Sequence, residues 1–513
     1  RMHAWLWLAA LPGLAAALCT GDAPPLVLDA QRLRLTLALE PAGATLLGVA
    51  ALLWTLAGAY ARTWLRGDEN AAQFAEWWLL TLSGSLTVFL AGDLFTFYAA
   101  YAVVSLAAWG LVVHDETARA RRAGAIYVGL AVVGEICLLI AFAQLAVAAP
   151  GDSLAIRDVV AAFPAASNRS ATIALLLLGF GLKIGLVPLH VWMPLGYAAA
   201  PHPAAAVMSG AAVKAGVIGL IHFLPFGTAL PWGGALAAIG FASAFYGAAI
   251  GVRQRDPKAI LAYSSVSQMG GIAAVLGTGL ASIDADSVSA ASFVAAHHVL
   301  VKGALFLALG VIAAGGARRK LLVFAPMLVL SLALAGLPLT GGALAKLAAK
   351  SPLGDGLAGA LAPWTAAATA MLMLHFVRRA AALARDGSPR AEEPGLVAWW
   401  LASAAAALIV PWWLASRVLS DPFREAIDAS NLGDALWPIA VGALAAVVLG
   451  RVERYVPLPE GDRIVAGARI ERLARRGSEY LEKADLRIEE WPVASLALLG
   501  IAITFGAAPV LGR

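Results

Sequence analysis

The sequence is dominated by apolar segments that are long enough to cross a lipid bilayer. A spanning helix needs about 20 mostly apolar residues. Of the 513 residues, 61% are hydrophobic and 13% are charged, whereas about a quarter of the residues of a soluble domain are charged. We therefore expect an all-α, polytopic membrane protein of about 14–15 transmembrane helices. The candidate spans are residues 4–19, 37–60, 77–92, 94–113, 124–148, 171–189, 204–223, 234–251, 259–280, 292–314, 322–345, 363–383, 396–416, 436–450 and 492–510.

The charges of the connecting loops predict the orientation. The loops after the second, fourth, eighth, tenth and twelfth spans are basic, whereas the loops after the third, seventh and ninth contain no lysine or arginine. Because basic loops stay on the cytoplasmic side, we expect the N-terminus and the basic loops to face the cytoplasm, with the chain in the cell inner (cytoplasmic) membrane. The first span is short enough to be a signal peptide, but only Arg1 and His3 precede it as basic residues. We expect it to be a membrane helix.

Residues 177–223 contain the strongest candidate for a functional site. This stretch has Lys183 in an apolar segment that Pro188 and Pro194 interrupt, followed by a second apolar segment with Lys214. A lysine in the interior of a span costs roughly 3 kcal/mol on insertion scales, and such residues usually face a bundle interior or a wet cavity. A proline-broken helix is tolerated where the freed backbone groups are buried in protein or line such a cavity. The combination suits an ion or proton pathway.

A similar feature in the second half suggests an internal duplication. Lys346 follows the Gly- and Pro-interrupted stretch GLPLTGGALAK. Paired interrupted helices at corresponding positions indicate inverted repeats around a transport site. We expect N-terminal membrane helices (1–92), a first repeat (93–230), a second repeat (231–385), C-terminal membrane helices (386–450), a short amphipathic surface helix on the cytoplasmic face (451–491) and a final transmembrane helix (492–513). The surface helix is either a solvated linker or a brace along a neighbouring subunit.

Several classes of chemistry have no signal in the sequence. Cys19 and Cys137 offer neither metal-ligand spacing nor a disulfide framework. No CxxC, haem-attachment or dinucleotide-binding motif is present. We therefore expect no cofactor, no metal and no catalytic residue in this chain. The net charge of +5 is spread over the loops and does not indicate nucleic-acid binding.

Five motifs in a fixed order resemble a known family. They are FGLKIGLVPLHVWMP, MSGAAVKAG, DPKAILAYSSVSQMG, HHVLVKGALFLALG and AGLPLTGGALAK. In this order they resemble the antiporter-like membrane subunits shared by respiratory complex I, membrane-bound hydrogenases and formate hydrogenlyases, and Mrp-type cation/proton antiporters. The resemblance covers residues 94–383. It implies a mid-membrane proton relay made of Lys183, Lys214, His298, Lys302 and Lys346.

One departure from the family pattern affects this relay. The family carries a Trp-Glu pair after its DLxTFY-like motif, and the resemblance implies that this glutamate is the partner of the central lysine. Here the stretch reads DLFTFYAAYAVV, with Ala102 at the glutamate position. Glu135 is the other acid deep in this part of the predicted bundle, and we hypothesise that it substitutes. The alternative is a glutamate that only joins two helices by hydrogen bonds.

Buried lysines suit proton transfer because their charge depends on their surroundings. Burial disfavours the charged form of a lysine and a nearby carboxylate favours it, so a partner that moves switches the proton affinity. The blander interpretation is snorkelling of the lysines toward the membrane surface. His190, His202 and His297 are candidates for the inlet or outlet of a pathway, although packed or cavity-edge histidines are the simpler interpretation.

We expect a proton-translocating membrane subunit that works with other membrane subunits and a cytoplasmic peripheral subunit. One alternative is energy coupling for inorganic-carbon uptake with a zinc-containing, carbonic-anhydrase-like partner, which the resemblance also permits. A second is a subunit of an Mrp-type Na+/H+ antiporter, and a third is a stand-alone transporter or quinone-reactive enzyme. The associated subunits and metals would distinguish these functions.

Overall fold

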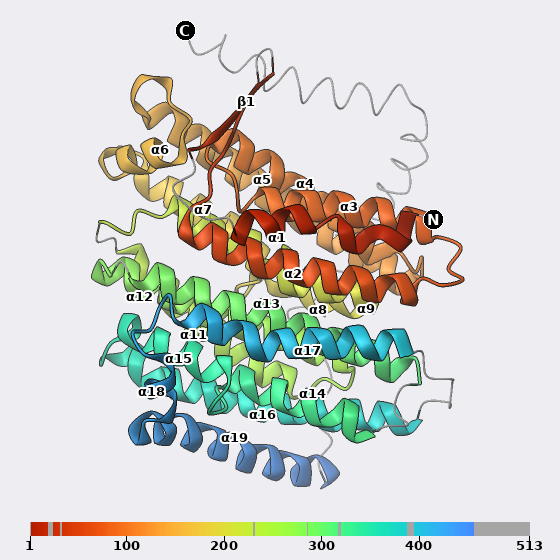
Figure 1. The fold of residues 1–513 in the computed structure, drawn as a ribbon. Coiled ribbons are helices and arrows are strands. Elements are labelled where there is room, and N and C mark those ends of the chain that lie inside the picture. Colours follow the sequence, from red (N-terminus) through yellow and green to blue (C-terminus); the bar gives the residue numbers. More distant parts are fainter. Residues whose placement is uncertain are drawn as a thin grey trace.

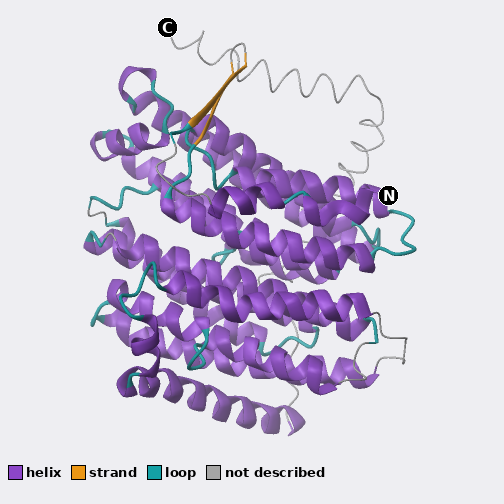
Figure 2. Cartoon of the chain, viewed as in Figure 1, coloured by secondary structure: helices purple, strands orange, loops and turns teal. Residues whose placement is uncertain are grey.

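The computed structural model describes residues 2–18, 24–30, 33–228, 231–284, 286–315, 320–386 and 394–455. Helices account for almost all of this structure, and one β-hairpin projects from it (Figure 2). This confirms the predicted all-α, polytopic fold. The amphipathic helix expected at 451–491 and the span expected at 492–513 lie outside the described residues, except that 451–455 continue the last described helix.

The first half of the chain contains two strands and ten α-helices, with short 3-10 or π turns between them. In order they are η1 (Met2–Leu8), α1 (Leu11–Leu18), β1 (Leu26–Ala30), β2 (Leu33–Leu37), α2 (Pro41–Trp64), α3 (Ala71–Thr87), α4 (Leu94–Val113), α5 (Ala118–Ala148), η2 (Pro150–Asp152), α6 (Ile156–Ala162), η3 (Phe163–Ala165), α7 (Arg169–Ile184), η4 (Leu189–Val191), α8 (Trp192–Ala199), α9 (His202–Val207), the π-helical turn η5 (Met208–Ala212) and α10 (Lys214–Phe223).

The described residues of the second half form helices joined by loops, with no strand among them. Its helices are α11 (Trp232–Gly251), α12 (Pro257–Ser282), α13 (Asp286–Ala313), α14 (Lys320–Ala335), α15 (Gly341–Leu353), α16 (Leu357–Asp386), α17 (Pro394–Ala415), α18 (Pro422–Ile427) and α19 (Ala429–Tyr455).

Eleven continuous or briefly interrupted helical segments of the described chain are long and apolar enough to cross a membrane. Two shorter apolar segments, residues 2–18 and 321–335, accompany them. The first predicted span, at 4–19, is in fact two short helices, η1 and α1, because the chain turns at Ala9 and Ala10. The span predicted at 322–345 divides into α14 and α15 where its glycines and proline interrupt it.

The helices lie side by side, with α3–α5 near the top of Figure 1, α16 and α19 at the bottom, and α17 in the middle, where it packs against α2 and α13. Helix α13 is central, because it packs against α2, α9, α12, α15 and α17. The most apolar stretch of α13 is completely buried, as is that of the segment from α9 to α10, whereas only 11% of the corresponding stretch of α19 is buried. Polar side chains within these two apolar stretches, on α10 and α13, are therefore enclosed by protein.

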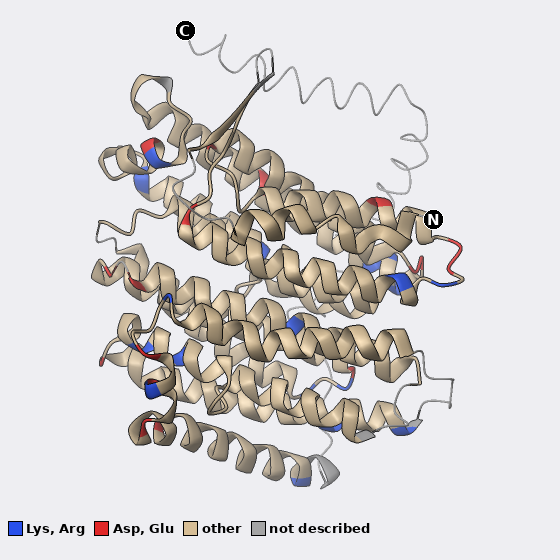
Figure 3. Cartoon of the chain, in the orientation of Figure 1, with Lys and Arg blue, Asp and Glu red and all other residues tan. Residues whose placement is uncertain are grey.

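Charged residues gather mostly at the two ends of the helices (Figure 3). This is the distribution expected when a bilayer surrounds the middle of the bundle. The few lysines located mid-length are thus exceptions that need an explanation.

The sequence analysis did not predict the β-hairpin. Strands β1 and β2 pair antiparallel, with Leu26 opposite Leu37 and Ala30 opposite Leu33. Asp93 anchors the hairpin to α4, because its carboxylate accepts a hydrogen bond from the backbone N–H of Thr36 at 2.6 Å and from that of Thr96 at 2.8 Å. The second bond caps the N-terminus of α4.

Candidate functional site

The central lysine lies at the break in the first interrupted helix. Helix α7 ends at Gly185, whose left-handed backbone (φ 72°) is the conformation that glycine adopts at low cost. Lys183 lies in the last turn of α7 and is 8% exposed. The indole N–H of Trp192, on α8 beyond the break, donates to the carbonyl oxygen of Leu182 at 2.7 Å. The break is therefore closed by protein, and Lys183 points into the bundle.

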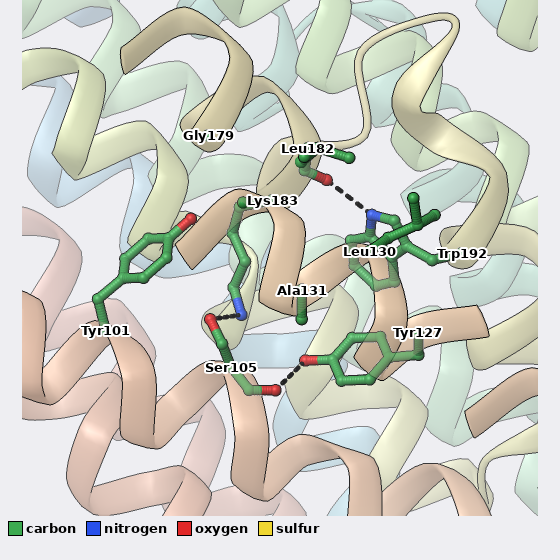
Figure 4. Close-up of a pocket in the computed structure, with 10 residues that line it drawn as sticks. Tyr101, Ser105, Tyr127, Leu130, Ala131, Gly179, Leu182, Lys183 and Trp192 are labelled. Atoms are coloured by element: carbon green, nitrogen blue, oxygen red, sulfur yellow. Dashed lines mark hydrogen bonds between the residues drawn. The ribbon is translucent and has the colours of Figure 1, made fainter. Parts of the chain in front are cut away.

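The ammonium group of Lys183 contacts α4. Its Nζ donates a hydrogen bond to Oγ of Ser105 at 2.9 Å and lies 5.6 Å from the centre of the Tyr101 ring (Figure 4). Ser105 is one turn beyond Ala102, where the family pattern has an acid. The sequence analysis missed Ser105, although its position three residues after Ala102 on a helix places both on neighbouring parts of one face.

Glu135 approaches this site from α5 without forming an ion pair. Its side chain is 7% exposed, it interacts electrostatically with Lys183, and its carboxylate is close enough to the Ser105 hydroxyl for an interaction of hydrogen-bond type. Within the described ranges, neither carboxylate oxygen has a partner at full hydrogen-bonding geometry, and no ion pair joins Glu135 to Lys183. The structure thus brings the hypothesised substitute acid close to the lysine, but it leaves the carboxylate without a direct contact to that lysine.

Lys214 is fully buried and bonds to a helix that is far away in the sequence. Its Nζ lies 2.7 Å from Nδ1 of His298 on α13 and 3.3 Å from the carbonyl oxygen of Ser209 in the π turn. Two protonated nitrogens cannot share a hydrogen bond, so at most one proton lies on the line between them. The π turn frees the Ser209 carbonyl from the usual helical pattern, which fits the frequent occurrence of π turns at functional sites.

A hydrogen-bonded network connects Lys214 to Lys302. Nζ of Lys302 donates to the carbonyl oxygen of Leu261 on α12 at 2.8 Å. The same carbonyl accepts a bond from Ser265 at 3.2 Å, and the hydroxyls of Ser265 and Ser209 are 2.9 Å apart. These groups link η5, α12 and α13 through buried polar atoms.

Helices α7 and α10 pack closely beside Lys183. A Cβ placed on Gly216, two residues after Lys214, would lie 3.0 Å from the Cβ of Lys183. Because residues two apart on a helix do not share a face, this contact places the backbone of α10, and not the Lys214 side chain, against Lys183.

Lys346 lies at the second break. Helix α14 ends before Gly336, which has φ of 97°, and α15 begins at Gly341. The side chain of Lys346 folds back over Gly336, and that of His297 packs against Gly341 and Gly342 at the start of α15. His297 and Lys346 interact electrostatically, and Nε2 of His297 has no hydrogen-bond partner among the described residues.

A cavity of about 410 Å³ adjoins this second break. His297, Lys346 and Gln268 lie on its wall, and Asn431, Asp434 and Lys350 are among its other lining residues. Lys350 on α15 and Asp434 on α19 form a largely exposed ion pair at 2.9 Å. At about 30 Å³ per water molecule, the cavity has room for roughly a dozen. It runs toward the ends of the helices that are opposite the basic C-terminal end of α16.

The other two candidate histidines lie elsewhere. His190, in η4, packs against the rings of Tyr246 and Tyr263, with centroids 5.2 and 6.1 Å away. His202 begins α9, and its ring centroid is 5.0 Å from that of Trp64. Lys258 interacts electrostatically with His202 and donates a hydrogen bond to the carbonyl oxygen of Ala200. His202 therefore belongs to one end of the bundle, where the basic loops gather.

No metal centre is formed by the part of the chain that the structure describes. There, no three histidine, cysteine, aspartate or glutamate side chains converge as metal ligands would. Cys137 is a buried free thiol on α5, and Cys19 lies outside the described residues.

Residues 91–349, just over half of the chain, match the family described as NADH:quinone oxidoreductase/Mrp antiporter, TM. The chain is 30% identical over 292 residues to hydrogenase-4 component B of Escherichia coli (strain K12), covering 54% of this chain and 43% of that protein. It is 29% identical over 331 residues to NADH-quinone oxidoreductase subunit N of Desulforudis audaxviator (strain MP104C), covering 60% and 65%. The fold resembles a chain of the Mrp complex from Dietzia sp. DQ12-45-1b, with a TM-score of 0.75 and 20% identity over 100% of this chain and 60% of that one. The present chain thus spans less than two thirds of each of these relatives.

Proposed function

Because the chain belongs to the NADH:quinone oxidoreductase/Mrp antiporter membrane family, we propose that it is the proton-translocating subunit of a multisubunit membrane complex. Protons move through its interior along Lys183, Lys214, His298, Lys302 and Lys346, with water filling the gaps. Partner subunits supply the free energy, either by redox chemistry or by antiport. Those partners are other membrane subunits and a cytoplasmic peripheral subunit, in the cytoplasmic membrane.

The contact between Lys214 and His298 carries this proposal. A 2.7 Å hydrogen bond between two titratable nitrogens joins α10 to α13 there. The two residues that form it are 84 positions apart in the sequence. An ammonium at Lys214 donates its proton to Nδ1 of His298, which leaves a neutral amine and an imidazolium. A structural lysine in this position would need only a carbonyl acceptor, and Ser209 already provides one.

Different groups lie at the two ends of the proposed pathway. His202 and Lys258 lie at the end of the bundle that carries the basic loops, and we assign the inlet to this region. The cavity beside Lys346 and His297 leads to the opposite end, and we assign the outlet to it. With the basic loops in the cytoplasm, protons move from the cytoplasm to the other side of the membrane.

Glu135 takes the role of the glutamate that the family pattern has at the position of Ala102. As Lys183 loses or gains a proton, the nearby carboxylate stabilises the charged form of the lysine. The electrostatic interaction between the two groups supports this assignment. No direct ion pair joins the two groups. Lys183 therefore releases its proton more readily than it would beside a carboxylate in direct contact.

The test is proton flux through the complex, purified with its native partners and reconstituted into liposomes. Lys183→Ala removes the group, and Lys183→Arg keeps the charge but cannot be deprotonated in a protein. We expect both variants to lose at least nine tenths of the flux while assembly is retained. Arg157→Ala, at an exposed position of α6, is the control. Unchanged flux in Lys183→Ala would reject the proposal.

The identity of the partners decides between variants of this function. Iron–sulfur or nickel subunits in the purified complex support redox coupling, and a set of cation-antiporter subunits supports Na+/H+ exchange. A zinc-containing cytoplasmic subunit supports inorganic-carbon uptake. Transport by the purified chain alone would contradict all three.

A further inference from the structure

A small cavity lies beside Lys183, between α4, α5, α7 and α8 (Figure 4). Its volume is about 20 Å³, and about 10–15 Å³ by this kind of measure is enough for one water molecule. Ser105, Lys183 and Tyr127 are among its lining residues, and the lining is mainly apolar. The cavity therefore has room for one water next to three residues with polar side chains.

The Ser105 hydroxyl makes no hydrogen bond along its own helix, and it interacts with the Glu135 carboxylate. Several buried serines in these helices donate to the carbonyl one turn back, as Ser243 does to Ile239 at 2.7 Å and Ser292 does to Val288 at 2.7 Å. Within the described structure Ser105 makes no such bond. Its Oγ accepts from Lys183, while its backbone carbonyl accepts from the Tyr127 hydroxyl at 2.7 Å.

Glu135 lies next to this cavity on the same strip of α5. Tyr127 and Ala131 line the cavity, and Glu135 is the next residue at the same spacing of four, so it lies one turn further along that helix face. Both carboxylate oxygens are buried and lack a hydrogen-bond partner in the described ranges. A buried carboxylate in this state is costly unless an ordered water bonds to it.

We propose that this cavity binds one water molecule and that the Ser105 hydroxyl, together with that water, relays a proton between Lys183 and Glu135. The inference rests on the proposed function. In this relay, Ser105 and the water carry out the proton transfer that would otherwise need a direct contact between Lys183 and Glu135.

The transfer is balanced at each atom. The Lys183 ammonium gives a proton to Oγ of Ser105 as the original hydroxyl proton passes to the water, and the water passes a proton to the Glu135 carboxylate. Lys183 is left as a neutral amine and Glu135 as a neutral carboxylic acid. Ser105 and the water end as a hydroxyl and a water molecule, with no net charge on either.

Two variants of the same shape separate the hydroxyl from the packing. Ser105→Thr keeps a hydroxyl, whereas Ser105→Val replaces it by a methyl group and leaves no room for a substitute water. In the reconstituted complex we expect the threonine variant to keep at least a third of the wild-type proton flux and the valine variant to lose at least nine tenths. Equal flux in the two variants would overturn the inference. If neither variant assembles, Ser105→Ala decides, because unchanged flux in that variant contradicts a role for the hydroxyl.

A second substitution tests the water. Ala131→Val adds methyl groups at the cavity wall without removing a polar atom, and we expect it to lower flux at least threefold. Unchanged flux would remove the water from the relay.

Infrared spectroscopy of the complex distinguishes relay from mere positioning of Lys183. After a pH jump, the carboxyl band of Glu135, identified with Glu135→Gln, should change more slowly in Ser105→Val than in Ser105→Thr but with the same amplitude. A change in amplitude at an unchanged rate indicates a structural role and contradicts the relay.

The flux measurements separate failure of this inference from failure of the proposed function. If Lys183→Ala retains flux, the proposed function itself fails. If Lys183→Ala loses flux but the two Ser105 variants have equal flux, only this inference is rejected.

Discussion

The ammonium nitrogen of Lys214 lies 2.7 Å from Nδ1 of His298, and both side chains are almost completely buried. Here, and at the contact between the hydroxyls of Ser209 and Ser265, buried polar groups of the first half of the chain meet those of the second. The bond between Lys214 and His298 joins two titratable side chains, so interrupting it tests the relay directly.

We predict that His298→Asn blocks proton flux but preserves the fold. The asparagine oxygen occupies a position similar to that of Nδ1 and accepts the hydrogen bond from Lys214, but an amide does not take up a proton. Flux in the reconstituted complex should fall at least tenfold. His222→Asn, at another buried histidine, is the matched control and should conduct normally.

His298→Ala should in addition destabilise the protein. It removes an acceptor from a fully buried lysine, and leaving a buried polar group without a partner costs about 1–3 kcal/mol. The thermal unfolding midpoint of the complex should therefore be lower for His298→Ala than for His298→Asn. Equal midpoints would show that the Ser209 carbonyl alone satisfies Lys214.

A double substitution tests whether Glu135 replaces the acid of the family pattern. Glu135→Gln should lower flux at least tenfold, because the amide neither stabilises an ammonium by charge nor accepts a proton. Ala102→Glu combined with Glu135→Gln should restore part of that flux by returning an acid to α4. No loss in Glu135→Gln would assign the residue a packing role only.

The lysines of the site could be predicted from the sequence because a charge inside an apolar segment is visible there. Lys183, Lys214 and Lys302 are all buried in the bundle, as predicted, and Lys346 lies at the second break. Ser105 could not be identified in this way. Serines are common in these segments, and what distinguishes Ser105 is the contact of α4 with the end of α7, which is a tertiary feature.

Helix ends and strands were harder to predict than helices. The span predicted at 77–92 corresponds to α3, which begins at Ala71 because Gln73 and Glu76 continue the helix on its exposed side. The hairpin of β1 and β2 was missed because its apolar residues, such as Leu26 and Leu28, lie in short alternating runs that are much shorter than a span. The two inverted repeats remain a prediction.

Chemical labelling tests the outlet. In a variant without Cys19 and Cys137, Ala362→Cys places a thiol in the wall of the 410 Å³ cavity. A charged, membrane-impermeant thiol reagent should reach it from the side opposite the basic loops, and Asp434→Asn should speed the reaction by breaking the ion pair with Lys350. Reaction only from the side of the basic loops would reverse the assignment of inlet and outlet.

The control for this experiment is a thiol on the lipid side of the same region. Val447→Cys lies on α19, where the native side chain is 54% exposed, and a charged reagent has no aqueous route to it through the bilayer. It should stay unlabelled from both sides. If it reacts as fast as Ala362→Cys, the labelling reports accessibility of α19 as a whole and not of the cavity.

The second helix break depends on a close approach that only glycine permits. A Cβ on Gly342 would lie 1.6 Å from the carbonyl oxygen of Ala333, which is a backbone atom and cannot rotate away. Gly342→Ala must therefore push the start of α15 away from the last turn of α14, at a cost of about 1–3 kcal/mol or more. This movement also displaces Lys346 and His297, since the His297 ring packs against Gly342. We expect both a lower unfolding midpoint and at least a tenfold loss of flux.

Gly356→Ala is the matched control for this substitution. A Cβ there meets no atom within 4 Å, so it should change neither the unfolding midpoint nor the flux. A stable, conducting Gly342→Ala variant would show that the two halves of the broken helix separate without consequence for the lysine beside them.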